Sequence, residues 1–339
     1  MSGSDQAAIE PTLAVSGLKT HFFTKAGVVK AVDGVSLHVN PGEILGLVGE
    51  SGSGKSITGF SILGLIDAPG RIVEGSIRYK GRELTTSSDE ELRSLRGDRI
   101  AMIFQDPMMT LNPVLRIDTQ MIETVHVHHR VSKAEALERA RAALAEVGIP
   151  SPESRLKNYP HELSGGMRQR VAIAIAFINK PDLIIADEPT TALDVTIQAQ
   201  ILAEAQALCA RTGTAMIWIT HDLAVVSSLA DRIAVMYAGR IVETGRTADV
   251  VSAPRHPYTQ GLINSVPSHN VRGSRLNQIP GMTPSLINLP KGCAFRTRCP
   301  QAIDACLEPP PIREIGPGRE VRCFNPVGVA RPATAEAAP

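Results

Sequence analysis

The sequence predicts an α/β fold whose central strands are buried on both faces. Residues 44–48 (ILGLV) and 183–186 (LIIA) are apolar without alternation, which is typical of strands covered on both sides. Stretches with helical periodicity separate these runs, and such an order favours an α/β core. The predicted strands lie at residues 35–39, 44–48, 76–79, 100–104, 183–186, 215–219 and 233–237.

Composition narrows the class of protein. The chain has 339 residues with 43% hydrophobic and 20% charged, an ordinary globular balance that excludes wholesale disorder. The net charge of +1 argues against nucleic-acid binding as the main function. The longest apolar run, residues 171–178, is far shorter than the ~18 residues of a spanning helix. The N-terminus lacks a basic start and an apolar stretch, so we expect no secretory signal and a cytosolic chain.

Changes of composition divide the chain. From residue 112 the pattern is helical and more polar, and Ser132 with Glu135 predicts a capping box for a helix that stops near Gly148. Prolines become frequent after residue 253, which indicates a second, irregular domain. The predicted segments are a flexible N-terminus (1–12), a main domain (13–253) with a helical subdomain (about 112–178), a C-terminal domain (254–325) and a disordered tail (326–339).

A phosphate-binding loop follows the predicted strand at 44–48. Residues 49–56 (GESGSGKS) fit the pattern G-x-x-x-x-G-K-[ST], with a helical pattern directly after them. In such a loop backbone N–H groups surround phosphate oxygens, the lysine reaches the β- and γ-phosphates, and the serine binds Mg²⁺. The candidate ATP-binding residues are Gly49, Glu50, Ser51, Gly52, Ser53, Gly54, Lys55 and Ser56.

Two carboxylates end the apolar run at 183–186. We expect Asp187 to hold Mg²⁺, directly or through water, and Glu188 to polarise the attacking water. A strand that ends in Asp-Glu is common and is weak evidence by itself. Together with the phosphate-binding loop, the pair is strong evidence for a nucleotide-hydrolysing site.

The run LSGGMRQR at residues 163–170 resembles the signature motif of the ATP-binding-cassette (ABC) ATPases. This resemblance implies the P-loop ABC nucleotide-binding fold. Ser164, Gly165 and Gly166 open a helix, and a helix N-terminus is a second phosphate site. In this family the signature of one cassette faces the phosphate loop of another, so the resemblance implies a head-to-tail dimer with ATP between two cassettes.

Four further positions match the same family. Gln105 stands where the Q-loop glutamine contacts Mg²⁺ and water, and Asp194 belongs to a D-loop that crosses the dimer interface. His221 matches the switch histidine at the γ-phosphate. Phe22, rather than Phe23, is the aromatic ring expected to stack on adenine. The resemblance thus makes Glu188, His221 and Gln105 the catalytic residues.

The C-terminal sequence (HPYTQGLINSVP, then LPKGCAFRTRCP) resembles the C-terminal extension of the oligopeptide/dipeptide importer ATPases. This resemblance implies an ATPase at the cytoplasmic face of the inner membrane. The implied partners are two membrane permeases, an extracytoplasmic solute-binding protein and a second, homologous cassette. Two alternatives stay open: the same machinery with nickel or another small solute as cargo, and a soluble ABC ATPase that acts on nucleic acid or ribosomes.

The C-terminal region also holds four of the five cysteines. Four thiolates can bind Zn²⁺ or a [4Fe–4S] cluster, and buried free thiols are the remaining alternative. The absence of a C-x-x-C pair weakens a zinc ribbon, and the family resemblance favours a structural iron–sulfur cluster. The expected ligands are Cys293, Cys299, Cys306 and Cys323, beside the expected cofactors ATP and Mg²⁺.

Overall fold

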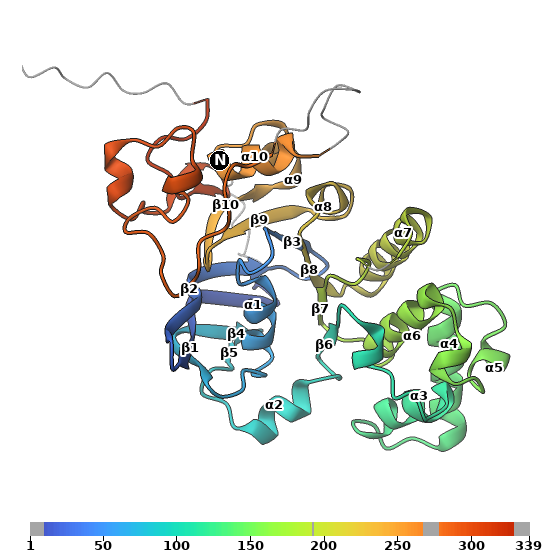
Figure 1. Ribbon diagram of the computed structural model, residues 1–339. Helices are drawn as coiled ribbons and strands as arrows, with labels where there is room; N and C mark the ends of the chain where they lie inside the picture. Colours follow the sequence, from blue (N-terminus) through green and yellow to red (C-terminus); the bar gives the residue numbers. More distant parts are fainter. Residues whose placement is uncertain (1–9, 192, 267–277, 329–339) are drawn as a thin grey trace, which may run out of the picture.

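Two β-sheets, a group of helices and a C-terminal segment make up the structure, a computed structural model that describes residues 10–191, 193–266 and 278–328 (Figure 1). The tails predicted at 1–12 and 326–339 lie mostly outside these residues. Within the described ranges, none of the helices combines the length and apolar character needed to cross a membrane.

The larger sheet has eight strands in the order β11-β12-β10-β9-β3-β8-β7-β6. Its centre is parallel, because β3 pairs in parallel with both β8 and β9, and β7 with both β6 and β8. The β10 edge is antiparallel. The strands are β3 (Ile44–Val48), β6 (Ile100–Ile103), β7 (Leu183–Asp187), β8 (Ala215–Thr220), β9 (Arg232–Tyr237), β10 (Arg240–Arg246), β11 (Arg313–Gly316) and β12 (Arg319–Val321).

Successive residues of the central strands enter two different cores. Leu183 and Ile185 of β7 pack on one face with Leu45 of β3, whereas Ile184 and Ala186 pack on the other. Every residue of β3, β7 and β8 is buried, which confirms the prediction of strands covered on both faces. Cys209, on α7 (Val195–Thr212), is 1% exposed in the second core.

The smaller, antiparallel sheet covers the first core, and α1 (Lys55–Ile62) lies between the sheets with contacts to both. Its strand order is β2-β1-β4-β5. The strands are β1 (Leu13–Thr24), β2 (Gly27–Val39), β4 (Gly70–Tyr79) and β5 (Arg82–Glu83), and α2 (Asp89–Leu95) follows them.

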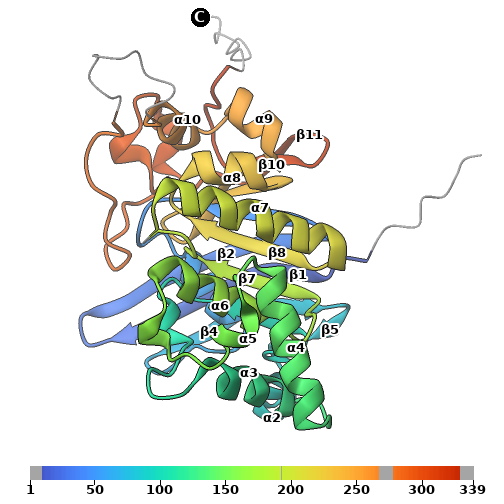
Figure 2. The same ribbon diagram turned by 90° about the vertical axis from the view of Figure 1, so that its right-hand side faces the viewer.

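The helical part follows β6 and lies to one side of the sheets, green in Figures 1 and 2. Ser132 caps α4, because its hydroxyl oxygen accepts a hydrogen bond from the N–H of Glu135. The helix ends at Glu146, close to the predicted stop. The elements are η1 (Pro107–Met109), α3 (Ile117–His126), α4 (Lys133–Glu146), α5 (Pro152–Arg155), η2 (Pro160–Glu162) and α6 (Gly165–Phe177).

The C-terminal segment is joined to the main sheet rather than standing apart. β12 pairs with β10 (Glu243 opposite Val321), and β11 pairs with β12. The rest of this segment has little regular structure, as its prolines predict. The remaining elements are α8 (Leu223–Leu229), α9 (Thr247–Ser252), α10 (Pro257–Asn264), η4 (Arg296–Arg298) and η5 (Asp304–Leu307).

Candidate nucleotide site

The loop between β3 and α1 requires glycine at two of its positions. A Cβ atom on Gly49 would lie 2.2 Å from the carbonyl oxygen of Met236. Gly54 has φ 102°, and a Cβ atom there would lie 2.1 Å from the carbonyl oxygen of Ala31. The loop therefore packs backbone against backbone and places the N-terminus of α1 at its end, as anion binding requires.

Lys55 lies under this loop and is only 5% exposed. Its Nζ donates hydrogen bonds to the carbonyl oxygens of Gly49 (2.8 Å) and Glu50 (3.0 Å). Burial lowers the pKa of Lys55, while the carboxylates of Glu188 and Asp187 act in the opposite direction. A buried ammonium group among carbonyl oxygens can attract a phosphate with little screening by water.

Ser56 and Asp187 meet where α1 begins and β7 ends. The Ser56 hydroxyl donates to Oδ1 of Asp187 at 2.9 Å. Burial raises the pKa of the Asp187 carboxyl group. A hydroxyl and a carboxylate in contact are oxygen ligands of the kind Mg²⁺ prefers, so this pair fits the expected ion.

Glu188 follows β7 in a left-handed backbone conformation (φ 45°). Its N–H donates to the carbonyl oxygen of Ile219 at 2.9 Å. Its carboxylate accepts a hydrogen bond from the Thr191 hydroxyl (3.1 Å) and lies 3.1 Å from Nδ1 of His221. The turn thus aims Glu188 at the end of β8, where His221 stands.

Lys55, Ser56, Glu188 and His221 line one cleft of about 620 Å³, a size suited to a small-molecule ligand. Asp187 contacts Ser56 but is not part of this lining. The structure therefore brings together predicted residues from the loop, the end of β6, the end of β7 and the end of β8. Thr191 and Ile57 also line the cleft and were not predicted as site residues. The lining residues are Glu50, Ser51, Gly52, Gly54, Lys55, Ser56, Ile57, Gln105, Glu188, Thr191 and His221.

Other predicted residues lie away from this lining. Ser164 caps α6, since its Oγ accepts from the N–H of Met167, and Gly165 beside it is exposed. Asp194 caps α7 in the same way through the N–H of Ile197. Phe22 is in β1, where its ring lies against Gly70. The signature and Asp194 thus stand at helix starts outside the cleft of their own chain.

The prediction of an iron–sulfur cluster is not supported. Cys323 is buried, and burial together with the other three thiols raises its pKa to about 12, which favours the protonated thiol. Burial also raises the pKa of Cys293 and Cys299, and the N–H of Cys293 donates to the carbonyl oxygen of Cys306. The four thiols share one region. In the described ranges, however, no three His, Cys, Asp or Glu side chains are arranged to hold a metal ion.

A sheet with a parallel centre, a glycine-rich loop on a helix start and an acidic strand end together define a P-loop nucleotide-hydrolysing cassette. Comparison with known proteins agrees. The family model for ABC transporters matches residues 32–191, and that for the oligopeptide/dipeptide transporter C-terminal region matches residues 242–306.

Relatives match almost the whole chain. The oligopeptide transport ATP-binding protein OppD of Escherichia coli is 49% identical over 322 residues, which cover 95% of each chain. AppD of Bacillus subtilis is 49% identical over 314 residues, 92% of this chain and 96% of the relative. Among solved structures, the dimeric bacterial ABC transporter cassette MJ0796 has a TM-score of 0.63 at 27% identity, covering 69% of this chain and 98% of that one. The chain belongs to the ABC transporter family of ATP-binding proteins and is an ATPase of that type.

Proposed function

We propose that this chain hydrolyses ATP to power the import of oligopeptides or dipeptides through membrane permeases. One observation carries the proposal: the catalytic candidates line a single cleft, in a chain whose residues 242–306 match the oligopeptide/dipeptide transporter C-terminal region. The relatives named above are oligopeptide transport proteins, which supports peptide rather than nickel as cargo. The net charge of +1 and this C-terminal match disfavour a role on nucleic acid or ribosomes.

In this proposal the loop binds the ATP phosphates with its backbone N–H groups, and Lys55 neutralises the β- and γ-phosphates. The contact between Ser56 and Asp187 supports their assignment, with Gln105, as the residues that hold Mg²⁺. Bound Mg²⁺ supplies charge neutralisation at the transferring phosphate. Phe22 stays our candidate for adenine stacking.

Glu188 is the proposed general base. Its hydrogen bonds with Thr191 and His221 restrict its carboxylate at the cleft wall, so a water molecule between it and the γ-phosphate can lose a proton to it. His221 is 54% exposed at the side chain, and we assign it to contact the γ-phosphate while it holds Glu188 in place.

We propose that a second cassette completes the site. Ser164 and Gly165 at the start of α6 are exposed, as is Asp194 at the start of α7, so both helix starts are available to another chain. The MJ0796 cassette is described as dimeric. The second cassette is proposed to be a homologous subunit. The further partners are two permeases and an extracytoplasmic solute-binding protein, with this chain peripheral at the cytoplasmic face of the inner membrane.

Uptake in cells tests the proposal. A strain without this chain is complemented with the wild type, with Glu188→Gln, or with Glu90→Gln, a matched control on an exposed residue of α2. We expect labelled di-, tri- and tetrapeptide uptake to be lost with Glu188→Gln, by about 100-fold or more, and to be unchanged with the control. Nickel uptake is measured in parallel. Loss of nickel uptake alone would replace the cargo, and full peptide uptake with Glu188→Gln would reject the assigned base.

A further inference from the structure

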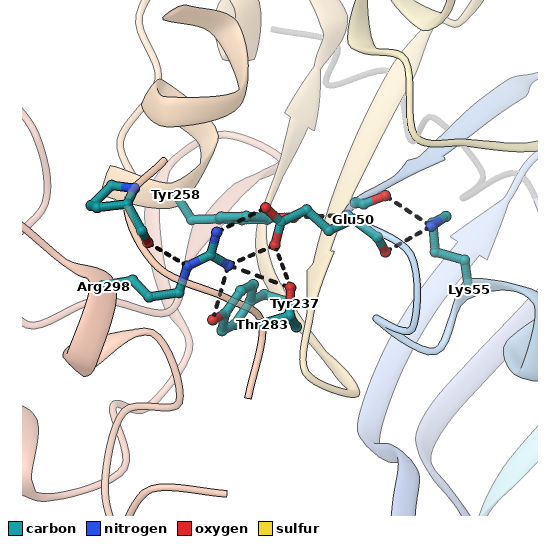
Figure 3. Close-up of polar contacts among 8 residues, drawn as sticks. Glu50, Lys55, Tyr237, Tyr258, Thr283 and Arg298 are labelled. Carbon is teal, nitrogen blue, oxygen red and sulfur yellow. Dashed lines mark hydrogen bonds and ion pairs between the residues drawn. The ribbon is translucent and has the colours of Figure 1, made fainter. Parts of the chain in front are cut away.

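A polar cluster connects the phosphate-binding loop to the C-terminal segment (Figure 3). At its centre is Glu50, the second residue of the loop. Arg298 donates two hydrogen bonds to its carboxylate, from Nη1 to Oε2 at 2.6 Å and from Nη2 to Oε1 at 2.9 Å. A bidentate pair of this kind fixes orientation as well as charge.

Arg298 is held firmly on its own side of the contact. Its side chain is 5% exposed, and its Nε donates to the carbonyl oxygen of Pro280 at 2.8 Å. The guanidinium carbon lies 5.9 Å from the ring centres of both Tyr237 and Phe295. The arginine is thus an ordered part of the segment and has little freedom to follow a moving loop.

Glu50 is held at each of its polar groups. Besides Arg298, the Thr283 hydroxyl donates to its Oε2 at 2.8 Å. Its N–H donates to the Tyr258 hydroxyl at 2.8 Å, and its carbonyl oxygen accepts from Nζ of Lys55 at 3.0 Å. Three of these contacts come from α10 or the segment that follows it. The C-terminal part of the chain therefore holds the same loop residue whose carbonyl oxygen Lys55 binds.

Charge gives this contact a second consequence. Hydrogen bonding with Arg298 holds the pKa of Glu50 below its usual range, so the group is a carboxylate at neutral pH. Glu50 also lines the cleft, and its side chain is 28% exposed. Without the guanidinium group this carboxylate would stand unpaired beside the phosphates of a bound nucleotide and repel them.

We propose that Arg298 is a positioning residue of the ATP site: through its bidentate pair with Glu50, the C-terminal segment holds the phosphate-binding loop in shape and neutralises its acidic residue. This inference rests on the proposed function, because it takes the cleft at Lys55 to be the ATP site. The C-terminal segment then contributes to ATP binding at the nucleotide site.

The test is the ATP dependence of hydrolysis by the assembled transporter with Arg298→Gln, Glu50→Gln and the double variant. We expect Arg298→Gln to raise KM for ATP about tenfold with a smaller change in kcat, since ground-state binding is affected first. The double variant is expected to bind ATP better than Arg298→Gln alone, because the unpaired carboxylate is gone. If Arg298 were purely structural, the variants would differ in stability but not in KM for ATP.

Arg319→Gln is the matched control. Arg319 also joins the C-terminal segment to the main sheet through a buried glutamate, with Nη2 to Oε1 of Glu243 at 3.0 Å, but neither residue lines the cleft. We expect KM for ATP to stay within about twofold of the wild type in this control. An equal rise of KM in Arg319→Gln, or none in Arg298→Gln, would overturn the inference.

Lys55→Ala tests the assigned ATP site separately from the role of Arg298. If Lys55→Ala abolishes ATP binding while Arg298→Gln leaves KM unchanged, only the inference about Arg298 fails. If Lys55→Ala still binds ATP normally, the assigned ATP site is wrong and the inference falls with it. Thermal unfolding of each variant in the complex shows that the compared proteins are folded.

Discussion

The centre of the main sheet and the C-terminal segment are held in place by different means. Strands β3, β7 and β8 consist of buried residues that pack on both faces of the sheet. The segment at 278–328 has two short strands and short 3₁₀ helices. It is attached by buried ion pairs, such as Arg298 with Glu50 and Arg319 with Glu243, and by packing of Phe295 against Tyr237 and Tyr258.

This difference shows what each kind of contact contributes. Apolar burial is non-directional and stabilises the sheet as a whole. The stable sheet in turn forms a rigid edge of the cleft. Ion pairs have a defined geometry, so they hold the C-terminal segment in a specific position on the main sheet. Variants that remove one kind of contact at a time test this division.

The largest effect is expected in the core. Trp218 in β8 is 1% exposed, and Phe295 in the C-terminal segment is 2% exposed. Replacing either with alanine removes about 3–5 kcal/mol of packing. We expect Trp218→Ala to lower the free energy of unfolding of the whole cassette, whereas Phe295→Ala loosens the segment first. Hydrogen exchange of β7 and β8 amides distinguishes the two, and equal loss of their protection in both variants would show one cooperative unit.

A smaller loss of stability is expected when the ion pair between Arg319 of β12 and Glu243 of β10 is broken. Glu243 is fully buried and also accepts from the N–H groups of Arg255 and His256, both at 2.8 Å. Arg319→Gln removes one charged donor and leaves these two, so we expect a loss of about 2 kcal/mol. Chemical denaturation measures this loss. No change in stability would mean that the two N–H groups suffice for the carboxylate.

The last effect on stability depends on pH and vanishes at neutral pH. His256 caps α10, with its Nδ1 accepting from the N–H of Tyr258 at 3.0 Å, and burial lowers its pKa to about 3. Below about pH 6.5 His256 is protonated in the unfolded chain but stays neutral in the folded chain. The free energy of unfolding should therefore fall as pH decreases from about 6.5 toward 3, by up to about 1.4 kcal/mol per pH unit from this group.

His256→Asn keeps a capping acceptor and removes this titration. Unfolding of both proteins by denaturant at about pH 7, 6 and 5 gives the comparison. We expect the variant to lose less stability than the wild type over this range. Parallel curves would show that His256 takes up a proton as readily in the folded chain as in the unfolded chain.

The sequence predicts those parts of the molecule whose signals are local. Strand 44–48 matches β3 (Ile44–Val48), and the cap at Ser132 matches α4, because each depends on neighbouring residues. β1 (Leu13–Thr24) was not predicted; its irregular alternation reflects register shifts against β2 and β4. β11 and β12 were missed because short edge strands among prolines carry no clear pattern.

The cleft follows the same rule. The loop, Asp187, Glu188, Gln105 and His221 were found because each follows a recognisable apolar run or motif. Thr191 stands three residues after Glu188 and could have been proposed from that spacing, since its hydroxyl reaches the same carboxylate. Arg298 has no such signal. Its partner is on a different part of the chain, and only the folded structure brings the two together.

The separation of Glu50 and Arg298 also orders events during synthesis. The two residues are 248 positions apart, so a growing chain exposes its phosphate-binding loop long before Arg298 is made. At the usual 5–20 residues per second, translation of the intervening chain takes roughly 12 to 50 s. During this interval the loop carries an unpaired carboxylate, and the nascent cassette should bind ATP weakly until Arg298 has been translated.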